Sequence, residues 1–307
     1  RTLAVPRLRQ GSGRECSLLA CLAVSTGTEY DMLMGASGAA FTTTIDTEGW
    51  DPLAASPLDD ATLERAALAA GVRTDRVEPP FDEEMRALVL DLVKGAIEAK
   101  LPPLVRGAIG PPEYGLVVGY DDATPKLYLR TYFDPTDEAP TIGWDAFTGP
   151  DKGTLVFLDR GTTPDRATLA RTGIDVATAS AQTRDVAMRS WLAALRDEPR
   201  WRDHKHGGAL AFADHAMRTI LHDKRRAAAR FLRSVREALP SRRGAEVLRA
   251  AEAYGKVADA AEKVGVGAFE PAVARRFVEG GQRRAWANAL EGALAHEAEA
   301  HDALRAA

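Results

Sequence analysis

RQGSGRECSLLACLAV, residues 9–24, holds both cysteines of the 307-residue chain and decides how its first half is interpreted. From Cys16 onward the apolar residues have helical spacing, and the glycine-rich residues 11–13 form a turn before them. A helix N-terminus carries unpaired N–H groups and a positive partial charge, which favour a thiolate and bind a developing oxyanion. The side-chain amide of Gln10 could fold back as a second oxyanion donor. Cys16 is therefore either a nucleophile or a small buried thiol.

The composition is that of an ordinary globular protein. A chain of 307 residues predicts two domains, because single cores rarely exceed about 250–300 residues. The net charge of −4 gives no reason to expect nucleic acid or an anionic membrane as a partner, and no apolar run approaches the ~20 residues of a membrane span. No signal peptide is visible in RTLAVPRLRQ (1–10), and two cysteines too close on one helix to pair fit a reducing compartment. We expect a cytoplasmic protein.

The first half of the chain, residues 1–162, has the pattern of an α+β domain. Apolar spacing and end signals predict helices at 16–26, 59–71 and 82–100. Blocks of Val, Leu and Tyr bounded by Gly, Pro and Asp predict strands within 101–109, 114–122, 125–135 and 153–161. ATPK (123–126) predicts a hairpin turn between the second and third of these strands. We expect helices first and an antiparallel sheet after them.

The second half, residues 163–307, is dominated by Ala, Arg, Glu and Leu and predicts an all-α domain. The expected helices are 164–171, 180–197, 207–222, 224–239, 242–264, 270–279 and 281–304. All six histidines lie in this half: His204, His206, His215, His222, His296 and His301.

Four segments of the first half carry a resemblance to a known family. Gln10, five residues and then Cys16 at the start of a helix resemble the layout of papain-like cysteine enzymes. EYGLVVGYDD (113–122) followed by LYLRTYFDP (127–135) is similar to the papain-like and bacteriocin-peptidase-like pattern of a strand with His, five residues and Gly-Tyr, then a turn, a strand and Asn or Asp. TGTEYDMLMGASGAAF (26–41) resembles the corresponding segment of the butirosin biosynthesis protein H family. The resemblance covers roughly residues 8–160. It implies a papain-like domain, followed in many members by a helical one.

The resemblance also implies a chemistry and a set of site residues. The family's namesake transfers an acyl group from an acyl carrier protein to an amine. In this chain Cys16 would be the nucleophile, while Gln10 and the backbone N–H of Cys16 would form the oxyanion hole. Asp134 would orient the base. Cys21, further along the same helix, is expected to be a core residue.

The base position departs from the family pattern, because Glu113 stands where the family has His. A carboxylate has a reference pKa near 4.3 against about 8.5 for a thiol, so transfer of the Cys16 proton to Glu113 is uphill by about 6 kcal/mol. An ionised Glu113 beside Cys16 would also raise the pKa of the thiol. An ordinary Cys–His protease is therefore not expected.

Four interpretations of Glu113 remain open. Burial could raise its pKa until it serves as a base or a neutral donor. An acyl thioester could need only modest activation, with the amine bringing its own base. A histidine of the helical half, His206 or His215, could reach the site. Finally, the chain could be an inactive binding protein. If Glu113 faces Asp134, the two carboxylates would share a proton or bind a cation or an amine.

Metal and docking sites are weaker expectations. His215 and His222 share a helix face, as do Glu297 and His301, but no HExxH or ExxH signature accompanies them, and we expect no metal. The basic stretches KRRAAARFLR (224–233) and RRFVEGGQRR (275–284) could dock an acidic carrier protein. The simpler expectation is a solvated helix face.

The sequence thus predicts a cysteine-dependent acyltransferase or amidohydrolase with Cys16, Gln10, Glu113 and Asp134 as catalytic residues. Its substrate would be a small amine-containing metabolite of natural-product biosynthesis, and no cofactor is expected. An acyl carrier protein or acyl thioester and a second copy of the chain are the further partners considered. The alternative is a catalytically inactive papain-like binding or scaffold protein.

Overall fold

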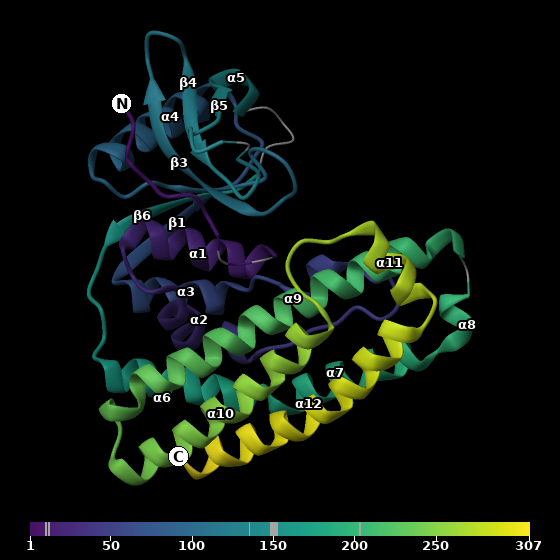
Figure 1. Ribbon diagram of the computed structural model, residues 1–307. Coiled ribbons are helices and arrows are strands. Elements are labelled where there is room, and N and C mark those ends of the chain that lie inside the picture. Colours follow the sequence, from purple (N-terminus) through teal and green to yellow (C-terminus); the bar gives the residue numbers. More distant parts are fainter. Residues whose placement is uncertain (10, 12, 135, 148–152, 203) are drawn as a thin grey trace. The chain divides into compact units, whose positions relative to one another are not determined.

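The chain forms two compact units, each built from two separate stretches of sequence. The computed structural model describes residues 1–9, 11, 13–134, 136–147, 153–202 and 204–307, with the backbone alone for 204–206. The first unit contains 1–33 and 63–164, and the second contains 34–62 and 165–307. This division differs from the predicted one at 162/163, since residues 34–62 belong to the second unit. Figure 1 shows the elements of both units.

A six-stranded antiparallel sheet is the centre of the first unit, in the order β1-β6-β2-β3-β4-β5. Its strands are β1 (Val72–Val77), β2 (Leu104–Arg106), β3 (Tyr114–Asp121), β4 (Lys126–Arg130), β5 (Thr141–Gly143) and β6 (Leu155–Arg160). Strand β3 is an unbroken apolar run that lies inside the sheet, and its residues 114–119 are buried. Asp121 pairs with Lys126, which confirms the hairpin predicted between β3 and β4. The mixed α+β class and the antiparallel sheet are also confirmed.

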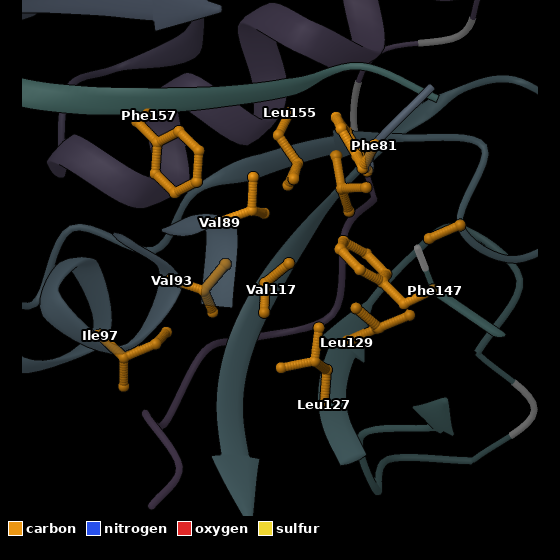
Figure 2. Close-up of a cluster of buried hydrophobic side chains, with 12 residues drawn as sticks. Phe81, Val89, Val93, Ile97, Val117, Leu127, Leu129, Phe147, Leu155 and Phe157 are labelled. Atoms are coloured by element: carbon orange, nitrogen blue, oxygen red, sulfur yellow. The ribbon is translucent and has the colours of Figure 1, made fainter. Parts of the chain in front are cut away.

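Helix α4 (Glu83–Glu98) covers one face of this sheet. Asp82 caps its N-terminus by accepting a hydrogen bond of 2.8 Å from the Met85 N–H. Its residues Val89, Val93 and Ile97 recur every four positions, so they form one stripe that is fully buried. Figure 2 shows this stripe in a common core with residues of the sheet. The cluster comprises Phe81, Val89, Val93, Ile97, Val105, Ala108, Val117, Leu127, Leu129, Phe147, Leu155 and Phe157.

The other helices that the first half contributes are α1 (Arg14–Thr26), α2 (Tyr30–Ser37), α3 (Asp60–Ala70) and α5 (Trp144–Phe147). Two short 3-10 helices lie between α2 and α3: η1 (Ala39–Phe41) and η2 (Pro52–Ala55). The expected helices at 16–26, 59–71 and 82–100 are present with shifted ends, while α2 and both edge strands were not predicted.

The second unit is helical, as predicted for residues 163–307. Its helices are α6 (Arg166–Ala179), α7 (Ala181–Arg196), α8 (Glu198–Trp201), α9 (His204–Val235), α10 (Ser241–Val264), α11 (Pro271–Val278) and α12 (Gly281–Ala306), with η3 (Arg236–Ala238) after α9. Helix α10 packs against both α9 and α12 (Figure 1). The predicted helices 207–222 and 224–239 are one helix, because no Gly or Pro interrupts residues 209–235. Among the described residues, no helix is both long and apolar enough to cross a membrane.

Residues 39–43 are held in the second unit by a buried ion cluster. Both Arg184 and Arg225 form salt bridges with Glu297, the first at 2.8 Å. The Arg225 guanidinium also donates to the carbonyl oxygen of Ala40 at 2.7 Å, and Arg184 donates to that of Phe41 at 3.0 Å. The charged groups are thus matched by a carboxylate and by main-chain oxygens, as burial requires.

The prediction of a solvated basic face at 224–233 holds for Arg230 and Arg233, which are exposed, and is wrong for the start of the stretch. Lys224 and Arg225 are buried, and Lys224 donates to Thr42 Oγ1 at 3.1 Å. Arg226 forms salt bridges with Asp259 and Glu262 of α10. In the second basic stretch, Arg283 is buried and is paired with Glu198 at 2.6 Å. Lys224, Arg225 and Arg283 therefore serve packing within the unit. The exposed basic residues of the two stretches are Arg230, Arg233, Arg275, Arg276 and Arg284.

Candidate functional site

Cys16 lies in the first turn of α1 and has no exposed surface (0%). The helix begins two residues earlier than predicted, because Gly13 adopts a positive φ of 85° and serves as the N-cap residue. The Gly13 carbonyl oxygen then accepts from the Ser17 N–H at 2.9 Å. Cys16 is consequently the third residue of the helix and not its tip. Gln10, the predicted second oxyanion donor, lies outside the described residues.

Glu113 lies immediately before β3, and its carboxylate is placed at the start of α1. Its Oε1 accepts a hydrogen bond of 3.1 Å from the N–H of Gly13. One residue on, the N–H of Tyr114 donates to Ser17 Oγ at 3.0 Å. Glu113 and the first residue of β3 therefore both contact the start of the cysteine helix. The predicted convergence of position 113 on this helix end is present, although the partner is a main-chain N–H.

Burial raises the pKa of Glu113, and the hydrogen bond from Gly13 opposes that change in part. The environment thus favours the protonated carboxyl more than water does. Cys21 lies one and a half turns further along α1 and is fully buried, which agrees with its expected place in the core. Burial raises the pKa of the Cys21 thiol well above its usual value, and the negative charge of Glu113 adds to the increase.

The side chain of Asp134 binds to residues of the turn that follows β4. Its Oδ1 accepts from the Thr131 N–H at 3.0 Å and from Thr131 Oγ1 at 2.8 Å, while Arg130 forms a salt bridge of 3.1 Å with Oδ2. Arg130 also donates to the Val5 carbonyl oxygen at 3.0 Å. In the described part of the chain, no hydrogen bond joins Asp134 to Glu113. The predicted pair of facing carboxylates that shares a proton therefore has no support in these contacts.

Two histidines of the helical half, His206 and His215, were predicted as a possible substitute for the missing base. His215 is buried within the second unit, with Nε2 2.8 Å from the Gly267 carbonyl oxygen and Nδ1 3.4 Å from Arg218. Both of its ring nitrogens thus have partners inside that unit. The side chain of His206 lies outside the described residues. Over the described ranges, no group of three His, Cys, Asp or Glu side chains could hold a metal ion.

Sequence reasoning missed the residues that join the cysteine helix to the sheet. Gly13 was expected only as part of a flexible turn, and Ser17 was not singled out. The glycine before a helical pattern is a signal for an N-cap, but nothing in the sequence indicates which strand the Ser17 hydroxyl meets.

The site therefore consists of a buried thiol in the first turn of α1 and the carboxylate of Glu113, which contacts the N-terminus of the same helix. The partial positive charge of the helix N-terminus stabilises an anion there, and Glu113 already occupies this position. No protein-family model matches the chain, and no curated protein matches it either. The butirosin biosynthesis protein H resemblance therefore stays a prediction.

Proposed function

We propose that the protein is a non-catalytic binding or scaffold protein of the cytoplasm, with a papain-like first unit that does not use Cys16 as a nucleophile. This proposal rests on the complete burial of Cys16. A nucleophilic thiol must reach its substrate as a thiolate, whereas thiols buried in structural positions are inert.

The contacts of the two carboxylates support the same function. Glu113 accepts from the Gly13 N–H at the position where a papain-like enzyme would need an imidazole. Asp134 is bound to Thr131 and Arg130. Each of the two therefore has a structural role that requires no substrate.

Acyl transfer through Cys16 is the second candidate, and one observation favours it. Glu113 is placed at the start of the cysteine helix with a pKa raised by burial, which is what a carboxyl base for a thiol would need. In that reaction the Cys16 proton moves to Glu113 as sulfur attacks an acyl thioester. The donor thiolate leaves and takes up the proton. An amine then attacks the new thioester, and its proton returns to Cys16 sulfur.

Alkylation of the two cysteines separates these candidates, with Cys21 as the matched control on the same helix. The protein is treated with iodoacetamide under native conditions and in urea, and each cysteine is followed by peptide mass spectrometry. The non-catalytic proposal predicts that both residues react at least about 100-fold more slowly in the native state, since an opening free energy of about 3 kcal/mol suffices for this. Native Cys16 that reacts as fast as unfolded Cys16, while Cys21 stays protected, would overturn it.

Intact-mass measurement with an acyl N-acetylcysteamine thioester tests the second candidate directly. Acyl transfer predicts an added acyl mass on the wild type and on Cys21→Ala, and none on Cys16→Ala. Glu113→Gln should then slow formation of the adduct, because the amide cannot take the proton. Absence of an adduct on every protein, with the fold intact by circular dichroism, supports the non-catalytic proposal.

A further inference from the structure

A cavity of about 670 Å³ in the second unit is lined by arginines from three helices. Arg171 comes from α6, Arg243 from α10 and Arg305 from α12. The volume lies within the range of about 300–1,000 Å³ that small-molecule sites occupy. The cavity is formed by residues 171–179, 239, 243 and 301–307 only, so it belongs to one unit and involves none of the residues around Cys16.

The three guanidinium groups form no salt bridge in the described part of the chain. Arg171 donates to the Thr168 hydroxyl at 3.0 Å, and its charge acts on Asp165. Among the described residues that line the cavity, the opposing charge is the carboxyl group of Asp175. Cationic groups therefore outnumber anionic ones.

His301 adds a polar ring to the wall of this cavity. It also lines a smaller adjacent cavity of about 280 Å³, whose wall includes Arg184 of the buried ion cluster. Burial lowers the pKa of His301, and the charges of Arg184 and Arg305 lower it further, while Asp302 opposes them. The Nδ1 atom of His301 is buried and has no hydrogen-bond partner among the described residues. A polar ring nitrogen is thus left unsatisfied beside the arginine cavity.

Part of the remaining wall is apolar. Ile174, Leu239 and Leu304 line the same cavity as the three arginines. A ligand that fits both walls carries an anionic head and an apolar body. Guanidinium groups bind phosphate through paired N–H donors, which a lone ammonium group cannot offer in the same geometry.

We propose that this cavity binds a small organic phosphate with an apolar substituent. The phosphate oxygens lie against Arg171, Arg243 and Arg305, and the substituent lies along Ile174 and Leu304. This site is separate from the residues around Cys16, so it stands whether or not Cys16 has a chemical function.

Calorimetric titration of the full chain with hexyl phosphate tests the site, with hexanol and inorganic phosphate as probes of each half of the ligand. Hexyl phosphate should bind more tightly than either, and the affinity should fall as salt is added. Arg171→Gln and Arg305→Gln should each weaken binding by about tenfold, the effect of losing one charge-assisted hydrogen bond. Arg189→Gln is the matched control, since Arg189 is an exposed arginine of α7 paired with Asp185 outside the cavity.

Two results would overturn the proposal. One is a dissociation constant above about 1 mM for hexyl phosphate and the wild type at low salt. The other is an affinity for hexyl phosphate that is the same in Arg171→Gln and Arg305→Gln as in the control Arg189→Gln. Phosphatidic acid vesicles separate a lipid headgroup from a free ligand. Binding to the vesicles without binding to hexyl phosphate also refutes a small-molecule site.

Discussion

Replacement of Glu297 by Gln tests the buried ion cluster that holds residues 39–43. Glu297 is the carboxylate that both Arg184 and Arg225 contact, and all three residues are buried. The amide keeps the shape of the side chain but leaves two buried guanidinium groups without their counter-charge. Breaking a buried pair by removing one partner costs roughly 3–5 kcal/mol. For a unit of this size the melting temperature should fall by roughly 6–20 °C.

Thermal and urea unfolding, followed by circular dichroism, measure this loss, with Glu291→Gln as the matched control. Glu291 lies on the same helix, and its salt bridge with Arg196 is exposed. An exposed pair contributes about 0–1 kcal/mol, so the control should shift the melting temperature by a few degrees at most. Equal shifts for the two variants would refute the assignment of Glu297 as the counter-charge of a buried cluster.

Three further perturbations have defined outcomes. Gly35→Ala should destabilise the second unit by about 1–3 kcal/mol in urea unfolding, because a Cβ there would lie 1.9 Å from the Phe231 ring, whereas Gly95→Ala, with open space around it, should be neutral or stabilising. Asp82→Ala should cost about 0.5–2 kcal/mol through loss of the α4 cap, and an unchanged unfolding midpoint would contradict that role. Burial raises the pKa of Asp214 to about 6, against the partial opposition of Arg218. The contribution of Asp214 to the free energy of unfolding should therefore fall by about 3 kcal/mol as pH rises from about 4 to 6. Urea titrations should show this slope flattened in Asp214→Asn, and an unchanged slope would contradict the assignment.

The parts of the fold that follow from apolar periodicity were predictable. The buried run of β3 and the stripe of α4 each carry a clear pattern, and both elements lie where the sequence places them. Strand β1 was missed because four of the six residues of VRTDRV are charged or polar. It is an edge strand that pairs with β6 alone, so its exposed side chains need not be apolar. The break expected near residue 223 was wrong, since a charged residue does not end a helix that packing supports.

The candidate site was predictable in its location but not in its contacts. The spacing of Gly119 and Glu113 places position 113 at the start of a strand, and the structure brings its carboxylate to the helix of Cys16. The depth of Cys16 could not be read from the sequence, because a nucleophile at a helix start and a buried thiol have the same apolar surroundings. The salt bridge between Asp134 and Arg130 depends on the turn geometry after β4, which spacing alone does not specify.

The membership of residues 34–62 in the second unit has a consequence for how the protein can be made. Arg225 donates to main-chain and side-chain oxygens that lie 185 and 182 positions earlier in sequence. During synthesis, residues 39–43 leave the ribosome long before the helices that enclose them, so the helical unit cannot complete its core until Glu297 has been synthesised. A fragment that starts at residue 163 should expose the cationic groups of Arg184 and Arg225 and precipitate. Co-expression with a peptide spanning residues 34–62 should restore its solubility.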